Sequence, residues 1–222
     1  MKNIIKYFAM IFAGLLLSVS CNGKSGESNA KAQTSGENNE QEKGQNDMNT
    51  SDKNEKVLIV FFSHAGENYG VGNIKVGNTK LVADEIQKLT GGDEFEVVAE
   101  KSYDMPYDAL TKLAKEEAER GEKPAFKGEV ENIDQYSTIF IGGPIWWGTY
   151  PQVMFTFFDR YDLNGKTIIP FSTHEGSGLG SVVSDLKKLY PKANFKPAFS
   201  IYGHECQKDL GKVDKWLRQL GY

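Results

Sequence analysis

Three loops in this 222-residue chain combine glycine with polar or aromatic side chains that could hold a ligand. The first, residues 63–79, leads into a predicted helix, and the unpaired N–H groups and dipole of a helix start favour an anion. Its spacing fits neither a dinucleotide-binding turn nor a nucleoside triphosphate loop, because Lys75 replaces a glycine of the former and Asn78 the lysine of the latter. Backbone amides with the Ser63, Asn78 and Thr79 side chains suit a phosphate monoester. An ordinary helix cap at Asn78 or Thr79 would give the same pattern.

The second loop, Gly142–Pro151, contains two adjacent tryptophans, Trp146 and Trp147, followed by Tyr150. No periodic core pattern explains both tryptophans. Aromatic side chains in a loop that a rigid scaffold holds suit a planar aromatic ligand. The alternative is packing against the protein itself, and we expect one of the two to be structural because tryptophan is usually largely buried.

The third loop, residues 173–181, contains His174 and Glu175 among glycines and serines. Small residues let the backbone approach a ligand and donate N–H groups to it. Acid–base catalysis by His174 and Glu175 is conceivable, but a single such pair on a flexible loop is more often a polar contact. We therefore assign no catalytic residue.

Secondary-structure patterns place the three loops at one edge of a sheet. Short apolar runs predict buried strands at 57–62, 94–99, 138–142, 167–172 and 198–202. Helical patterns predict helices at 79–89, 107–120, 152–161, 179–189 and 207–220. This alternation predicts an α/β fold with a mostly parallel sheet covered on both faces. Such sheets bind ligands beyond the carboxyl ends of their strands, where all three loops begin.

With these loops in place, the chain resembles the flavodoxin family, and more narrowly the flavodoxin-like proteins that carry a Pro-Ile-Trp-Trp loop. The resemblance rests on Gly77-Asn78-Thr79 and on residues 143–148, and it covers residues 57–202. It implies a three-layer sandwich, a five-stranded parallel sheet of order 2-1-3-4-5, and noncovalently bound FMN. The family's phosphate loop is usually compact, whereas here residues 64–76 separate Ser63 from Gly77.

The resemblance also implies which residues bind FMN. They are Ser63, Gly77, Asn78 and Thr79 at the phosphate; Pro144, Ile145, Trp146, Trp147 and Gly148 beside the isoalloxazine; and Thr173, His174 and Gly176 in the second ring-side loop.

Electron transfer is the activity that this resemblance implies, with a redox partner protein or a small electron acceptor. The loops would act as a redox clamp: a carbonyl between Trp146 and Thr149 would turn to accept a hydrogen bond from the reduced flavin, which Gly148 makes inexpensive. Stacking on Trp147 and the mild negative charge would lower the potential. The alternative is an NAD(P)H-dependent reductase of quinones, nitro compounds or free flavin, with residues 101–107 at the rim of its substrate site. A third interpretation is an interaction module that has lost the cofactor.

The amino terminus has the order of an export signal. Lys2 and Lys6 precede an apolar run that ends at Leu17, and small residues lead to Cys21. The run is shorter than the roughly 20 residues that a membrane span needs. The ending resembles a bacterial lipobox, which implies a signal peptide at 1–20, lipidation of Cys21 and a membrane-anchored location in the cell envelope, outside the cytoplasm. A plain signal peptide is the alternative.

Composition bounds the remaining possibilities. Residues 21–55 are almost entirely polar and predict a disordered tether, because burial cannot offset their ordering entropy. Residues 56–222 suit one domain. A net charge of −4 argues against a nucleic-acid partner. Two cysteines, Cys21 and Cys206, with no repeated Cys/His spacing, exclude a disulfide or zinc framework.

Overall fold

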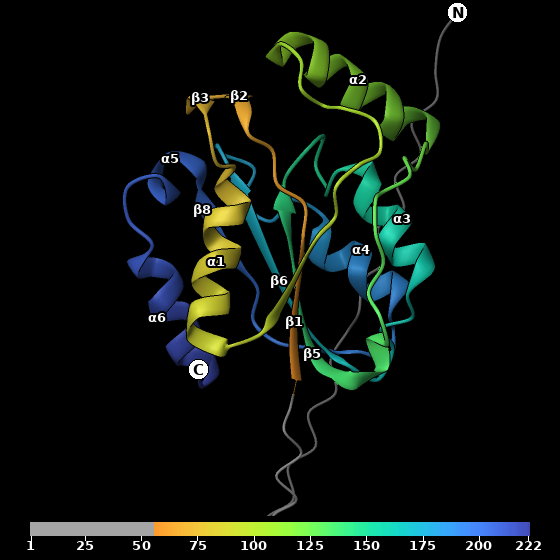
Figure 1. Cartoon of the computed structure of the whole chain (residues 1–222), viewed down its shortest axis with the longest axis vertical. Helices are drawn as coiled ribbons and strands as arrows, with labels where there is room; N and C mark the ends of the chain where they lie inside the picture. Colours follow the sequence, from red (N-terminus) through yellow and green to blue (C-terminus); the bar gives the residue numbers. More distant parts are fainter. Residues whose placement is uncertain (1–55) are drawn as a thin grey trace, which may run out of the picture. The chain divides into compact units, whose positions relative to one another are not determined.

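The computed structural model describes residues 56–222, which form a parallel sheet flanked by helices (Figure 1). The sheet strands are β1 (Lys56–Phe61), β4 (Asp93–Glu96), β5 (Tyr136–Pro144), β6 (Thr167–His174), β7 (Asn194–Phe195) and β8 (Phe199–Tyr202). Their order is β4-β1-β5-β6, and β7 and β8 both pair with the outer side of β6. Counting β7 and β8 as one position, this is the order 2-1-3-4-5, and the predicted flavodoxin-like architecture is confirmed.

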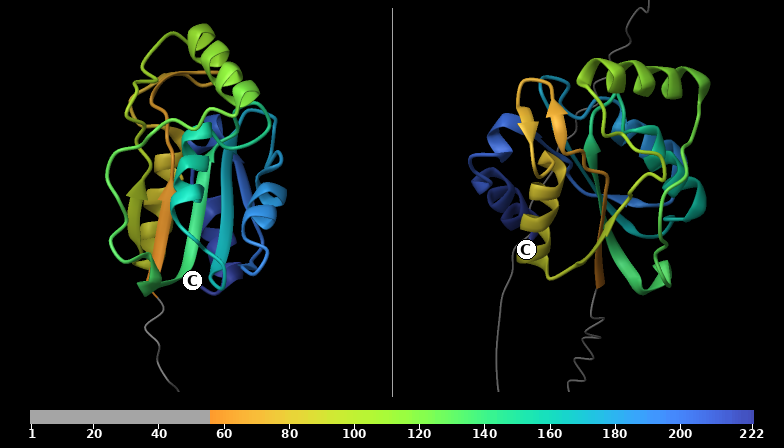
Figure 2. Two further views of the ribbon diagram at one scale, coloured as in Figure 1. Left: turned by 90° about the vertical axis from the view of Figure 1, so that its right-hand side faces the viewer. Right: turned by 45° about the horizontal axis from the view of Figure 1, so that its top comes forward.

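The helices divide between the two faces of the sheet and its carboxyl edge. On one face lie α1 (Asn78–Thr90), α5 (Gly203–Cys206) and α6 (Gly211–Leu220); on the other lie α3 (Gln152–Arg160) and α4 (Val182–Leu189). Helix α2 (Tyr107–Arg120) lies across the carboxyl edge at the top of Figure 1, beside a small hairpin of β2 (Gly66–Asn68) and β3 (Gly72–Ile74). A short 3₁₀ turn, Ile133–Gln135, precedes β5. The edge that the loops occupy is therefore covered by two additional elements (Figure 2).

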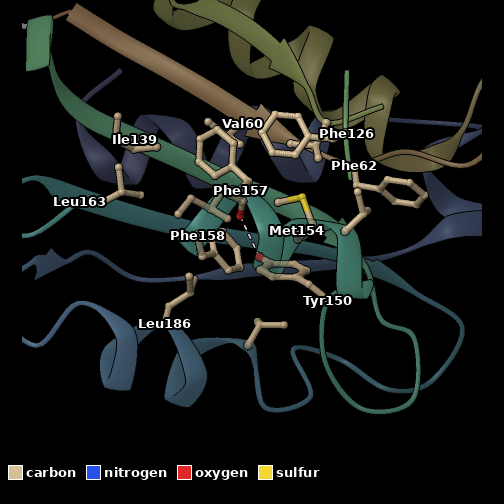
Figure 3. Close-up of a cluster of buried hydrophobic side chains, with 14 of the residues drawn as sticks. Val60, Phe62, Phe126, Ile139, Tyr150, Met154, Phe157, Phe158, Leu163 and Leu186 are labelled. Atoms are coloured by element: carbon tan, nitrogen blue, oxygen red, sulfur yellow. Dashed lines mark hydrogen bonds between the residues drawn. The ribbon is translucent and has the colours of Figure 1, made fainter. Parts of the chain in front are cut away.

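The core consists of two layers because the central strands are buried on both faces. Ile59 and Phe61 of β1 pack toward α1 and α6, whereas Leu58 and Val60 pack toward α3. Figure 3 shows part of the α3 layer, in which Tyr150 lies among apolar side chains. This two-sided burial explains why the strands are continuous apolar runs in the sequence.

Three predicted elements, one strand and two helices, were wrong in their bounds. The strand expected at 94–99 is β4, which ends at Glu96. The helix expected at 207–220 is two helices, α5 and α6, with a break at 207–210, and the helix expected from 179 begins at Val182. The strand expected at 198–202 is β8, and β7 is a further short strand on the same side of β6 that was not predicted. Pro170 of β6 lies opposite the gap between them, and its missing N–H explains why the ladder is interrupted there. Within residues 56–222, no helix is long and apolar enough to cross a membrane.

Candidate functional site

A cleft of about 260 Å³ opens at the carboxyl edge of the sheet, and all three loops contribute to it. Seven of the lining residues were predicted from the sequence: Asn78, Thr79, Pro144, Ile145, Trp146, Thr173 and His174. The other seven were not predicted as cofactor ligands: His64, Asn68, Tyr69, Val71, Tyr107, Glu175 and Ser177. Sequence segments far apart in the chain thus meet at one concave site, the usual form of a ligand site in this kind of sheet.

The start of helix α1 forms one end of the cleft. Ser63 Oγ accepts the Lys80 N–H at 3.0 Å, so this side chain caps the helix from the preceding loop. Gly77 makes that approach possible, because a Cβ there would collide with Ser63 Oγ and lie 2.7 Å from the His64 carbonyl oxygen. The first N–H groups of the helix, at Asn78 and Thr79, have no intrahelical acceptor. They therefore offer donors and positive dipole charge to an anion.

Buried hydrogen bonds hold the helix start against the third loop. The Thr79 and Thr173 hydroxyls lie 2.9 Å apart, and these residues are only 1% and 3% exposed. Asn78 Oδ1 accepts from Gln207 Nε2 at 2.8 Å, which leaves the Asn78 amide nitrogen as a donor. The Thr79–Thr173 bond thus joins the first loop to the third, and the Asn78–Gln207 bond joins the first loop to the end of α5.

The two adjacent tryptophans have different environments. Trp146 lines the cleft and packs edge-on against Phe62 and Tyr103, with ring centroids 5.2 and 5.3 Å away. Trp147 is 52% exposed and does not line the cleft. Its Nε1 donates to the Thr111 carbonyl of α2 at 3.0 Å. Trp146 is therefore the indole that a ligand in the cleft would meet.

A tight turn at residues 146–149 presents these side chains. The Trp146 and Thr149 backbones bond in both directions, at 2.8 and 3.3 Å. Trp147 and Gly148 both have positive φ, 51° and 90°, as in the mirror-image turns of hairpins. Positive φ is strained for a side chain as large as tryptophan, so the Thr111 bond and packing must hold it.

Five predicted residues lie outside the cleft lining: Ser63, Gly77, Trp147, Gly148 and Gly176. Ser63 and Gly77 shape the start of α1, and the Gly148 carbonyl accepts from Ser181 N at 2.7 Å. Their part in cofactor binding stays a prediction.

Three of these other lining residues, Asn68, Tyr69 and Val71, belong to the β2–β3 hairpin, which lies within the 64–76 segment that lengthens the first loop. Glycines at 66, 70 and 72, all with positive φ, mark this hairpin and are its only clear sequence signal.

The hairpin joins helix α2 above the cleft. Glu67 Oε2 accepts the Tyr107 N–H at 2.8 Å, which caps the first turn of α2. The Tyr69 and Tyr107 rings stack with centroids 6.0 Å apart and 29° between their planes. We call the hairpin and the first turn of α2 the cover.

A second cavity, of about 460 Å³, lies beside the first, between the loop after β1 and residues 96–104. The segment 101–107, predicted as the rim of a substrate site, is divided between the two: residues 101–104 line this cavity, and Tyr107 lines the cleft. His64 lines both.

Burial controls the ionisable groups of the cleft. Desolvation lowers the pKa of His64 and of His174, although nearby Asp104 and Glu175, respectively, oppose the shift. Glu175 is held in place by His204, whose backbone N–H and ring Nδ1 lie 2.9 and 2.7 Å from its two carboxylate oxygens.

Among the described residues, no group of three or more potential ligands could hold a metal ion, and Cys206 is buried and forms no disulfide. Cys21 and the other residues before 56 lie outside the described part.

Solved structures with the same fold include flavoproteins from two Bacteroides species and from Lactobacillus acidophilus. A candidate flavoprotein from Bacteroides eggerthii DSM 20697 is 29% identical, covers 75% of this chain and 98% of its own, and has a TM-score of 0.58. One from Bacteroides uniformis ATCC 8492 is 26% identical over 74% and 98%, with a TM-score of 0.60. A flavoprotein from Lactobacillus acidophilus NCFM, solved in complex with FMN, is 23% identical over 73% and 98%, with a TM-score of 0.54, and at that identity supports the fold alone.

No curated protein matches the chain. The flavodoxin family, however, matches residues 56–220, which is almost the whole described domain and most of the chain. Together with the strand order and the cleft formed by the three loops, this match shows that the chain belongs to the flavodoxin family.

Proposed function

We propose that this protein is an FMN-dependent electron carrier, anchored to a membrane outside the cytoplasm through lipid on Cys21. The observation that carries the proposal is the cleft itself. It joins an anion-binding helix start at Asn78 and Thr79 to an indole at Trp146, within one concave site at the carboxyl edge.

The cofactor of the domain is FMN, and the residues present fit it. A phosphate needs several N–H donors, and the start of α1 supplies them. A planar ring needs an apolar face, and Trp146 with Ile145 and Pro144 supplies one. His64 Nε2, buried and without a hydrogen-bond partner in the described domain, also indicates a polar ligand there.

FMN, when bound, supplies one- and two-electron transfer, and the protein adjusts its potential. In the turn at 146–149, the Trp146, Gly148 and Thr149 carbonyls accept backbone N–H groups. The Trp147 carbonyl is the one carbonyl of this turn without a partner among residues 56–222. It is therefore the carbonyl of this turn that is free to act as the hydrogen-bond acceptor of the proposed redox clamp.

The lipid anchor and the partner belong to the proposal on sequence grounds alone. Cys21 follows small residues at the end of an apolar segment, and about 35 polar residues separate it from the domain. This arrangement would let the cleft reach a redox partner away from the membrane surface. A Cys21→Ala variant that still partitions with membranes would exclude lipidation there as the anchor.

The first experiment is an absorbance spectrum of the purified protein after FMN addition and desalting, followed by anaerobic titration with NADPH. Retained flavin that NADPH does not reduce supports a carrier that awaits a protein partner. Rapid reduction would favour the NAD(P)H-dependent reductase instead. A protein that retains no flavin contradicts both.

A further inference from the structure

The imidazole of His64 separates the cleft from the second cavity, because it lines both. Its Nε2 atom is buried and has no hydrogen-bond partner within residues 56–222. Leaving a buried polar atom unpaired is unfavourable, and native structures contain few of them. The atom therefore indicates a ligand group that completes its hydrogen bonding.

The other ring nitrogen decides whether Nε2 donates or accepts. The Glu67 backbone raises the pKa of His64, which is the effect of a carbonyl that an imidazole N–H points toward. Because Nε2 has no partner, we assign that N–H to Nδ1. A neutral histidine carries one N–H, so Nε2 has a lone pair and accepts.

The ring of His64 lies between the hairpin and the indole. The His64 carbonyl lies so close to Gly77 that a Cβ there would be 2.7 Å away, and it accepts from Asn68 Nδ2 at 3.3 Å. The ring meets the Trp146 indole edge-on, with centroids 6.0 Å apart. A Cβ on Gly66 would lie 3.9 Å from Nε2, so this atom lies next to the hairpin, where the ring lines both the cleft and the second cavity.

The charged groups around His64 leave it neutral near pH 7. Burial lowers its pKa more than Asp104 and the Glu67 backbone raise it. The other ionisable groups facing it are Glu96, Glu100, Lys101, Tyr103 and Lys127 across the second cavity, and Tyr69, Tyr107, His174 and Glu175 across the cleft. A neutral acceptor does not suit a phosphate, which needs donors.

The donors for a phosphate lie elsewhere in the cleft. Thr79 and Asn78 bond toward Thr173 of β6 and toward Gln207, whereas the His64 ring faces Trp146 and the Asp104 loop. We propose that His64 is a further cofactor ligand, whose Nε2 accepts a hydrogen bond from an N–H or O–H group of the isoalloxazine or ribityl part of FMN. This inference rests on the proposed FMN binding.

The test compares FMN with riboflavin, which lacks the phosphate. In the full chain, His64→Leu is expected to weaken binding of both flavins by the same factor, about five- to tenfold, the value of one hydrogen bond. His64→Gln, whose amide oxygen can occupy the place of Nε2, is expected to restore most of that loss. Weaker binding of FMN alone would mean that His64 pairs with the phosphate and would overturn the proposal, as would unchanged binding of both flavins. Circular dichroism and thermal unfolding confirm that each variant is folded.

The pH dependence of riboflavin binding is a second readout. Protonated Nε2 cannot accept, so affinity is expected to fall as the pH drops through the pKa of His64 and to be flatter in His64→Gln. Increasing affinity at lower pH, lost in His64→Gln, would overturn the proposal.

Side-chain ¹⁵N NMR separates failure of this inference from failure of the proposed function. In the flavin-free chain, His64 is expected to carry its proton on Nδ1, and flavin is expected to shift the Nε2 signal. A proton on Nε2 in the flavin-free chain would overturn the inference even if FMN binds. A wild-type chain that binds neither flavin would overturn both.

Discussion

The two sides of the cleft are built in different ways. The wall, residues 77–79, 142–146 and 171–174, consists of strand ends and a helix start. Beneath it, the Tyr150 hydroxyl lies 2.8 Å from both the Ile141 and Phe171 carbonyl oxygens and ties β5 to β6. The cover is exposed: Tyr69 is 66% accessible, and the bond from Tyr107 N to Glu67 and the ring stack join its two parts.

This difference assigns the selectivity of binding and the rate of cofactor exchange to different sides of the cleft. Buried elements with many contacts open at free energies near that of global unfolding, whereas exposed segments with few contacts open far more easily. We therefore expect the wall to determine which groups are bound, and the cover to determine how fast the cofactor enters and leaves. Each substitution below tests one side.

The largest effect is expected at Gly77 of the wall. An alanine Cβ would meet the His64 backbone, which cannot move without displacing the first loop from the start of α1. Gly77→Ala is expected to lower the free energy of unfolding by about 1–3 kcal/mol, as overpacking does. It should also weaken FMN binding at least tenfold. Urea denaturation and flavin titration measure the two effects, and Gly211→Ala, whose Cβ has no neighbour closer than 3.3 Å, is the control. Equal stability of the two variants would contradict a rigid wall.

The next largest effects are expected from alanine substitutions of the two adjacent tryptophans, of which only Trp146 belongs to the wall. Trp146→Ala removes a side chain that packs on Phe62 and Tyr103, and it is expected to lower stability by about 2 kcal/mol and FMN affinity about tenfold. Trp147→Ala removes the bond to Thr111 and is expected to leave affinity within about threefold while shifting the flavin midpoint potentials. Photoreduction of the two loaded variants gives the potentials. Unchanged midpoints in Trp147→Ala would count against the redox clamp, and a larger loss of affinity there than in Trp146→Ala would reverse the roles assigned to the two indoles.

The same difference explains what the sequence could and could not predict. Strand ends and the start of α1 follow from apolar periodicity, and the sheet order and the seven lining residues were expected from the resemblance to the flavodoxin family. The cover could not, because the Tyr69–Tyr107 stack joins residues with no shared periodicity, and strands of three residues are too short to show alternation. The break at 207–210 was missed because its apolar spacing still fits one helix.

A smaller effect is expected from loosening the cover. Glu67→Gln keeps the size of the side chain but removes the charge that caps the start of α2. The dissociation rate of FMN is expected to rise several-fold, while the free energy of unfolding changes by less than about 1 kcal/mol. Stopped-flow transfer of flavin to an excess of a second apoflavoprotein measures the rate. The matched control is Glu85→Gln, a partly buried α1 carboxylate that pairs with Lys88 away from the cleft. A dissociation rate equal to that of the control would remove the distinction between wall and cover.

The smallest effect concerns pH, and it involves two histidines that line the cleft. His64 and His174 both have pKa values below the ordinary value because burial disfavours their charged form. Between the lowered pKa and the ordinary value of about 6.5, the unfolded chain binds more protons than the folded chain, so stability decreases as the pH falls through this range. In the flavin-free protein, His64→Gln and His174→Gln should each flatten part of the decline measured by urea denaturation between pH 7 and 5. If only His174→Gln flattens the decline, His64 is not buried in the flavin-free protein. The neighbouring hairpin would then be displaced from His64, and the cover would be open for much of the time when no flavin is bound.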